Sequence, residues 1–329
     1  MKKICFVLIL ACALNAQSQN DSTISKTLID TASVFSSMTD DLAALKDLVS
    51  ETSSYFNVNA SIGNQLFSKN NFSLNSQQST VNTLSFKPGA GYYHKSGFSL
   101  SGLGYLNLSN TKGGFYQYSI TPAYDYNGHE NLVAGISYTH YFTPAKDTIP
   151  GFATPYDHEF YAYTYLSKGI IQPGIAFGYA TGKYTGIFRG KVQGPLGGGV
   201  VFVVDSQKTK QADLSFSVSV QHDFTWYDVI ARNADLSFTP TLMLNTGSSK
   251  TTVLSHSNKI VNNIVLKRPN NKFSKENAGF EVYSLGLSLN LLYEIGRFYI
   301  QPEAYLDYYL PQSDKKITSL FSVAAGLNL

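Results

Sequence analysis

The sequence has little cysteine, little charge and no long hydrophobic run beyond its first residues. Its two cysteines, Cys5 and Cys12, both precede Ala16, in a segment that we expect to be removed on export. The remaining chain would then contain no cysteine. An exported protein of this kind would fold in an oxidising compartment without a disulfide.

The first residues have the pattern of a secretory signal peptide. Lys2 and Lys3 are followed by an apolar run from Ile4 to Leu14. Cleavage after Ala16 assigns residues 1–16 to the signal peptide. The stretch Ile9-Leu10-Ala11-Cys12 loosely resembles a lipoprotein processing site. That alternative is less favoured, because Leu10 fits the pattern poorly and cleavage there leaves a short apolar core.

Charged residues make up only 14% of the chain, whereas soluble proteins carry about 25%. Tyrosine and phenylalanine are abundant, with 23 and 21 copies. Removing Lys2 and Lys3 from the 25 basic residues leaves 23 against 22 acidic ones, a net charge of +1. This balance gives no indication of nucleic-acid binding. The deficit of charge favours a surface that faces lipid.

No stretch after the signal peptide is apolar enough for a membrane-spanning helix. The longest uninterrupted apolar run is Val200–Val204, whereas a spanning helix needs about 18 such residues. If the mature chain lies in a membrane, it must therefore form a closed β-barrel, because an open sheet would leave edge hydrogen bonds unmet in lipid.

The region from Phe280 to Leu329 alternates apolar and polar residues in three segments. Such a period of two indicates β-strands, each about ten residues long, which suits a tilted strand crossing a bilayer. The predicted apolar positions are Tyr283, Leu285, Leu287, Leu289, Leu291 and Tyr293, then Phe298, Ile300, Pro302, Ala304, Leu306 and Tyr308, and finally Ile317, Ser319, Phe321, Val323, Ala325, Leu327 and Leu329.

This pattern resembles the outer-membrane β-barrels of Gram-negative bacteria, including porins. In that class the last strand is terminal and carries the signal read by the barrel-assembly machinery. The resemblance places this signal at Gly326, Leu327 and Leu329, although the final residue is Leu where the class usually has an aromatic residue. It implies a multi-pass barrel in the outer membrane, with a periplasmic N-terminus.

The same alternation extends back to residue 54, so residues 54–329 are assigned to an all-β, closed, antiparallel, up-and-down barrel. We count about 14 strands, or 12 if the glycine-rich pair at 183–192 and 198–204 lies outside the barrel. Short turns near Lys95, Asn127, Lys168, Arg232 and Gly296 are expected at the periplasmic end. Longer loops at 68–80, 143–157 and 246–278 are expected outside.

Residues 17–53 differ from the rest of the chain. Phe35, Met38, Leu42, Leu45 and Val49 recur at spacings of three and four, which predicts a short amphipathic helix. A periplasmic helix at the barrel mouth is the favoured interpretation. A plug in the lumen, a helix on the inner leaflet and a partner-binding helix remain alternatives.

The polar faces of the strands are expected to point into the lumen. Ionisable groups there need water or a partner, so they predict either a hydrated pore or a packed interior. Five acids against three bases weakly favour cations. The candidate pore-lining residues are Lys87, Asp125, Arg189, Lys191, Asp213, Asp223, Glu303 and Asp307.

The loop 246–278 is basic, with Lys250, Lys259, Lys267, Arg268, Lys272 and Lys275 against Glu276 alone. It could contact phosphates of lipopolysaccharide, although a solvated loop without a ligand is the simpler interpretation. The lipid bilayer is the other expected partner, and the sequence leaves the oligomeric state open.

We find no pattern for catalysis, a metal or a cofactor. Outer-membrane phospholipases carry His and Ser two residues apart, and His94-Lys95-Ser96 is the one match, without an evident acidic partner. The other histidines show no metal-ligand spacing. The abundant aromatic residues are interpreted as girdles at the membrane interfaces.

The leading functional hypothesis is a porin-like channel for small hydrophilic solutes, because a barrel of this size can leave a passage. The rival hypothesis is a non-conducting barrel that acts as a structural or partner-binding subunit of an envelope complex.

Overall fold

The computed structural model describes residues 53–64, 84–108, 114–129, 131–144, 153–193, 200–261, 264–267, 272–277, 279–310 and 317–329. These residues form strands, turns and loops. No helix among them is long and apolar enough to cross a membrane. The expected signal peptide at 1–16 and the expected amphipathic helix within 17–53 lie outside the described residues, except for Ser53.

The described strands belong to one antiparallel sheet. They are β1 (Tyr55–Gly63), β2 (Ser85–Tyr93), β3 (Phe98–Asn107), β4 (Phe115–His129), β5 (Leu132–Phe142), β6 (His158–Leu166), β7 (Gln172–Gln193), β8 (Val200–Gln221), β9 (Phe224–Tyr227), β10 (Ala234–Val261), β11 (Ile264–Lys267), β12 (Lys272–Asn277), β13 (Glu281–Ile295), β14 (Phe298–Tyr309) and β15 (Ile317–Asn328).

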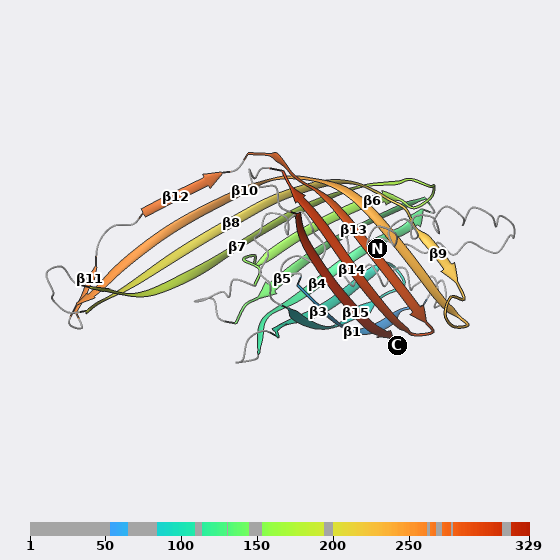
Figure 1. The fold of residues 1–329 in the computed structure, drawn as a ribbon, viewed down its shortest axis with the longest axis horizontal. Helices are drawn as coiled ribbons and strands as arrows, with labels where there is room; N and C mark the ends of the chain where they lie inside the picture. The colour runs from blue at the N-terminus through green and yellow to red at the C-terminus, as the bar shows by residue number, and fades with distance from the viewer. Residues whose placement is uncertain are drawn as a thin grey trace, which may run out of the picture.

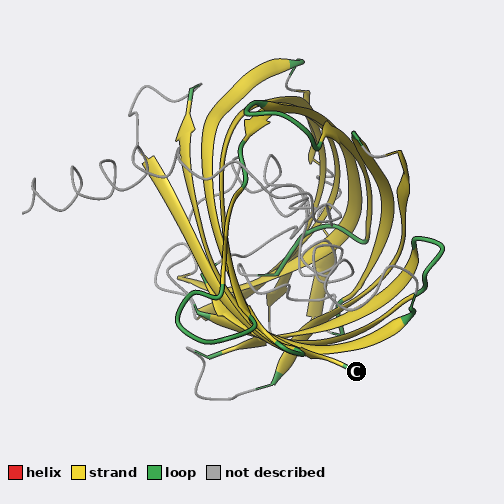
Figure 2. Cartoon of the chain, turned by 90° about the vertical axis from the view of Figure 1, so that its right-hand side faces the viewer, coloured by secondary structure: helices red, strands yellow, loops and turns green. Residues whose placement is uncertain are grey.

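Twelve of these strands close into a barrel, seen end-on in Figure 2. Each of the twelve pairs with two neighbours in the ring. The short strand β9 pairs with β10 in the same register as β8 and so continues the β8 wall, whereas β11 and β12 pair with β10 beyond the ring. β15 closes the ring against β1, with Leu327 opposite Val58. The expected all-β, closed, antiparallel barrel is confirmed, and its strand number is the lower of the two predicted.

The glycine-rich pair does lie outside the ring, but not as separate strands. β7 and β8 pair without interruption from Gln172 opposite Gln221 to Gln193 opposite Val200. β6 accompanies β7 only as far as Thr181. Residues 183–192 and 198–204 are therefore assigned mainly to the far ends of two long strands. The boundary predicted before residue 183 lies inside a strand.

The expected loop 246–278 is likewise largely strand. β10 continues to Val261 and pairs with β8 along most of its length, while β12 pairs with its other edge. We call one part of the structure the arm. It consists of β7 after Thr181, β10 after Gly247 and the part of β8 that pairs with them, together with β11 and β12. Figure 1 shows the arm extending to the left of the barrel. Pairing continues here because no residue interrupts the ladder of backbone hydrogen bonds.

The two ends of the barrel differ. The turn end carries the short connections, including His94–Gly97, the segment 167–171 and Gly296-Arg297. Gly97 and Gly296 have φ values of 92° and 61°, the left-handed region that glycine adopts at little cost. The loop end carries the connection between β5 and β6 and the arm. Both ends of the described chain, Ser53 and Leu329, lie at the turn end, as an even number of strands requires.

Candidate functional site: the polar interior

The barrel has inverted polarity. Its outward side chains are apolar and exposed to the surroundings, as with Phe56, Ile136, Leu242 and Phe321 at 43%, 50%, 51% and 50% exposed. Its inward side chains are polar and buried, including Asn57, Lys87, Asp213, Thr241 and Ser284. A water-soluble protein has the opposite arrangement. This is the architecture of an outer-membrane β-barrel, and it makes the interior the candidate functional site.

Lys87 of β2 faces this interior and is 1% exposed. Glu303 of β14 is the acid whose charge acts on its ammonium group. β1 and β15 lie between the two strands, and they carry small inward residues here: Ser61 is opposite Lys87, and Ala324 is opposite Ser61. A long lysine side chain can therefore extend across them toward β14. The predicted residues Lys87 and Glu303 thus place opposite charges on the inner face of the same part of the wall.

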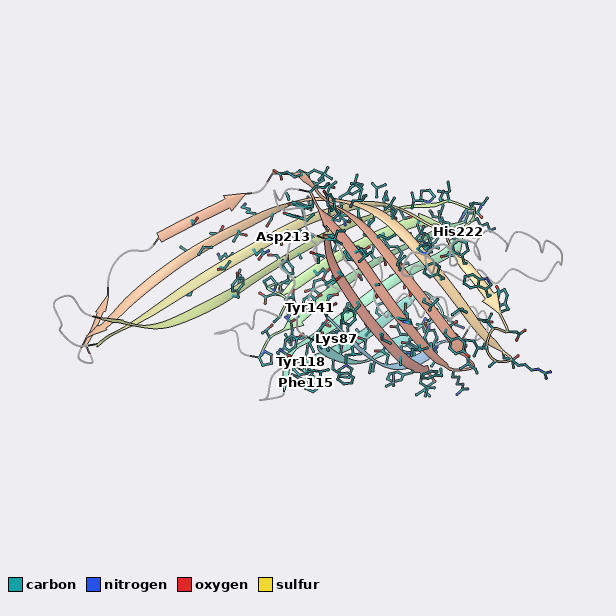
Figure 3. The ribbon with its side chains drawn as sticks, viewed as in Figure 1. Lys87, Phe115, Tyr118, Tyr141, Asp213 and His222 are labelled. Carbon is teal, nitrogen blue, oxygen red and sulfur yellow. The ribbon has the colours of Figure 1, made fainter. Side chains whose placement is uncertain are left out.

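Asp213 of β8 lies at the loop end, where the arm leaves the barrel, and is completely buried (Figure 3). Its carboxylate accepts hydrogen bonds from the hydroxyl of Tyr156, from Oγ of Ser249 at 2.5 Å and from Nε2 of Gln211 at 2.7 Å. Three donors compensate the cost of burying the charge.

Tyr156 belongs to residues 153–157, which we call the inner strap. This segment follows β5 and packs inside the barrel, where Thr154 and Tyr156 are each 2% exposed. Gln117 of β4 holds the strap at one end: its Nε2 donates to the Thr154 carbonyl and its Oε1 accepts from the Thr154 amide, both at 3.2 Å. Asp213 holds the other end through Tyr156.

β7 has a glycine, Gly182, where it passes the inner strap, because there is no room for a side chain. A Cβ atom at residue 182 would be 2.0 Å from the carbonyl oxygen of Pro155 and 2.6 Å from Cα of Tyr156. The glycine therefore permits two backbones to approach closely. Residues 143–157 were predicted to form an outer loop, and no pattern in the sequence indicates that 153–157 fold inward.

Asp307 of β14 joins a second buried cluster. The hydroxyl of Tyr305 donates to its Oδ1 at 2.9 Å, and Nδ2 of Asn245 donates to the Tyr305 oxygen at 3.0 Å and to Oγ of Ser284 at 3.1 Å. These residues come from β10, β13 and β14. They form a continuous polar chain across three strands, which rigidifies this part of the wall.

Two further predicted residues lie toward the turn end. Asp125 of β4 accepts a hydrogen bond from the hydroxyl of Tyr163 at 2.8 Å, and Asp223 accepts one from Oγ1 of Thr239 at 2.9 Å. The two remaining candidates, Arg189 and Lys191, have their backbones in the arm, opposite Val204 and Phe202 of β8. The structure therefore brings six of the eight candidates into the barrel and leaves two beyond its ring. Their role in lining a pore stays a prediction.

Two inward acids were not among the predicted pore-lining residues. Glu159 and Glu294 are 3% and 5% exposed, and the hydroxyl of Tyr141 donates to Oε2 of Glu159 at 2.7 Å. Glu294 lies in β13, two residues before the predicted turn at Gly296. The missed signal was alternation: Glu159 has the same parity in β6 as the inward residues Tyr161 and Tyr163.

Many tyrosines also face inward, contrary to the interpretation of the aromatic residues as interfacial girdles alone. Several lie opposite glycine on the neighbouring strand: Tyr163 opposite Gly135 and Tyr165 opposite Gly174. Glycine leaves room for each ring. The buried tyrosines are Tyr55, Tyr93, Tyr105, Tyr141, Tyr156, Tyr161, Tyr163, Tyr165, Tyr283, Tyr299 and Tyr305.

Tyr283 was predicted on the apolar, outward face, and this is wrong: it is 3% exposed. The cause is a bulge. Asn245 lies opposite Ser284, but Thr246 lies opposite Val282, so β13 has one extra residue at this point. A bulge breaks the strict alternation and lets neighbouring residues point to the same side.

The predicted assembly signal lies at the seam of the barrel. Leu327 and Leu329 are outward, at 41% and 57% exposed. The amide of Leu329 donates to the Phe56 carbonyl at 2.8 Å, and the Phe56 amide donates to the Leu329 carbonyl at 3.0 Å. Gly326 lies opposite Tyr299. These contacts give the terminal residues a structural role, while recognition by assembly machinery stays a prediction.

The His94–Ser96 pair forms a turn contact. Nδ1 of His94 lies 2.8 Å from Oγ of Ser96 and accepts the Ser96 amide at 3.2 Å. Among the described residues, no carboxylate forms a hydrogen bond with the His94 ring, so this pair is not part of a catalytic triad there. Within the described ranges, no group of three or more His, Cys, Asp or Glu residues could hold a metal ion.

No family model and no curated protein matches the chain. Among solved structures, the NanC porin has a TM-score of 0.34 and 10% identity, covering 83% of this chain and 98% of its own. A bacterial polysaccharide outer membrane secretin has a TM-score of 0.34 and 5% identity, covering 85% and 99%. OmpT of Vibrio cholerae has a TM-score of 0.21 and 9% identity, covering 84% and 97%.

Proposed function

We propose that this barrel is a porin-like channel for passive passage of small hydrophilic solutes across the outer membrane of a Gram-negative bacterium. The observation that carries the proposal is the polar, charged inner face beside an apolar outer face. Water and polar solutes are stabilised along such an interior, and lipid along such an exterior. In the proposed orientation across the membrane, the turn end and the N-terminus are periplasmic, and the arm is on the outer side.

The interior also suggests a preference for cations. Among buried charged side chains, Lys87 is the single base in the described residues, beside the acids Glu159, Asp213, Glu294 and Asp307. Negative groups along a pathway raise the local concentration of cations.

The test is conductance of the purified protein in a planar bilayer under a salt gradient. Stable current steps with a reversal potential of the sign set by cations are expected. Lys87→Met should shift that potential further toward cations, and Glu303→Gln should shift it toward anions. Lys95→Met, at the exposed turn between β2 and β3, is the matched control and should leave it unchanged. Absence of current from the full chain would overturn the channel proposal.

A second function is favoured by one specific observation. The interior side chains are covered almost completely, with Asn57, Asp213, Thr241, Asn245 and Ser284 at 0% exposed. A packed interior suits a non-conducting barrel that acts as a structural or partner-binding subunit of an envelope complex. Absence of current together with reproducible co-purification of another envelope protein would support this alternative.

The basic segment 246–278 supports a further part of the proposal, contact with lipopolysaccharide phosphates. Five of its lysines lie within β10, β11 and β12 of the arm: Lys250, Lys259, Lys267, Lys272 and Lys275. Binding to lipopolysaccharide micelles that weakens with salt would support this contact, because the attraction is electrostatic. Insertion of the barrel by the barrel-assembly machinery remains part of the same proposal.

A further inference from the structure

Two histidines meet on the outer wall of the barrel, away from its interior. His140 of β5 and His158 of β6 are direct cross-strand partners. Both have outward parity: their neighbours Tyr141 and Glu159 are buried inside. The pair lies at the loop end, where β6 begins, and no contact of the proposed channel interior includes it.

The ring nitrogens of this pair are close and face each other. Nδ1 of His140 lies 3.1 Å from Nδ1 of His158, and the ring centroids are 4.7 Å apart. The hydroxyl of Tyr138 lies 2.6 Å from Nδ1 of His158, and its ring stacks on the His158 ring with centroids 6.0 Å apart. Tyr138 and His140 are two residues apart in β5, so both project from the same face of the strand.

Hydrogen bonds alone satisfy the nitrogen atoms of this arrangement poorly. Each neutral imidazole has one N–H and one nitrogen lone pair. Nδ1 of His158 is within hydrogen-bond distance of both Tyr138 and His140, although a single lone pair or a single N–H serves one partner well. A cation placed between the two Nδ1 atoms would use both lone pairs at once.

The separation of the nitrogens fits a shared metal ion. Zinc–imidazole bonds of about 2.0–2.1 Å place two nitrogen ligands about 2.9 Å apart at a right angle and about 3.3 Å apart at a tetrahedral angle. The observed 3.1 Å lies between these values. The ring of Phe142 packs edge-on against His140 with centroids 4.4 Å apart. An apolar neighbour of this kind limits competing hydration of the ligands.

We propose that His140 and His158 bind a divalent transition-metal ion of the kind that imidazole prefers, such as Zn²⁺ or Cu²⁺, through their Nδ1 atoms. Water or an external ligand completes the coordination. Tyr138 is a positioning residue: it stacks on His158 and fixes the ring orientation. The site has two imidazole ligands, so it is an open surface site rather than a closed structural one.

The test is isothermal titration of the purified full-length protein, without a histidine tag, with ZnCl₂ in detergent. Saturable binding is expected, and His140→Ala should weaken the affinity of this site at least tenfold. His158→Gln, which retains a polar side chain, should have the same effect and provides a second variant. His129→Ala is the matched control, because His129 is an exposed histidine of β4 whose Nδ1 accepts the Asn131 amide.

Electron paramagnetic resonance of the Cu²⁺-loaded protein provides the second readout. Nitrogen hyperfine structure from two imidazoles is expected in the unmodified protein, and from one in His140→Ala. Tyr138→Phe keeps the stacking ring and both imidazoles, so the two-nitrogen hyperfine pattern should remain. Equal zinc affinity in the unmodified protein, His140→Ala and His158→Gln would overturn the proposal, as would a Cu²⁺ spectrum unchanged by both variants.

Discussion

The ring of Tyr299 on β14 lies against Gly326 of β15, so close that a Cβ atom at residue 326 would be 2.5 Å from Cε1 of Tyr299. Tyr299 is fully buried inside the barrel. The ring fills the space that glycine leaves on the neighbouring strand, next to the seam where β15 meets β1. Gly326 therefore contributes both to the closing strand of the barrel and to the packing of the Tyr299 ring.

Gly326→Ala should destabilise the barrel by about 1–3 kcal/mol, because the added methyl group overpacks a site that has no room for it. The midpoint of thermal unfolding, followed by far-ultraviolet circular dichroism in detergent, measures the effect. Gly279→Ala is the control, since no atom lies within 4 Å of a Cβ there. In a Tyr299→Ala background the added methyl group should cost much less. Equal midpoints for the two single glycine variants would contradict this account.

Removing the Lys87 charge should destabilise the barrel more than removing an exposed lysine. Lys87→Met removes the positive charge that acts on Glu303 and should lower the free energy of unfolding. Chemical unfolding curves measure the change. The double variant Lys87→Met/Glu303→Gln should recover a large part of the loss, whereas Lys95→Met should lie near the unmodified protein. If the double variant is as unstable as the sum of its single changes, the two groups are not coupled.

Releasing the inner strap should expose Tyr156 to chymotrypsin. Asp213→Asn keeps the shape of the side chain but removes the charge that accepts the Tyr156 hydroxyl, and charge-assisted hydrogen bonds are roughly twice as strong as neutral ones. Cleavage after Tyr156 is expected to become several-fold faster. Gly182→Ala should act in the same direction, because its methyl group displaces the strap backbone.

Ser249→Ala is the control for this experiment. It removes one donor to Asp213 and leaves the contacts of Tyr156 and Gln211 in place. Its cleavage rate should stay close to that of the unmodified protein. Identical rates for Asp213→Asn, Gly182→Ala and the unmodified protein would show that other contacts hold the strap.

The outward face should reject charge in a way that depends on depth. Leu242 lies in the middle of the β10 wall and is 51% exposed, so Leu242→Arg should cost about 2–4 kcal/mol in a bilayer. Ile295, at the turn end of β13, is expected to tolerate Arg at a cost of about 0–1 kcal/mol. Leu242→Ala separates the lost apolar contact from the added charge. Reversible unfolding from lipid vesicles measures all three. Equal costs at both depths would argue against a membrane around this face.

Much of the barrel could be predicted because alternation is a local property. The alternation of apolar and polar residues alone predicted that Leu285, Phe298 and Leu327 lie on the outward face, and the structure confirms this. The alternation gave the wrong side for Tyr283, where a bulge inserts one residue, and the prediction divided β7 and β8, where residues 183–192 and 198–204 were expected to form separate strands. Neither error was avoidable from local pattern, since the partner strand decides whether a glycine marks a turn or a close approach.

The sequence by itself determined the class of the protein. A period of two, a shortage of charge and the lack of a long apolar run leave a closed membrane barrel as the consistent solution, because lipid penalises any unpaired backbone group. Tertiary structure decided which residues meet. Lys87 and Glu303 belong to strands far apart in the chain, and Tyr156 reaches Asp213 because a loop folds inward. His140 and His158 become neighbours through the register of one hairpin. Register and closure are long-range properties, and no spacing along the chain encodes them.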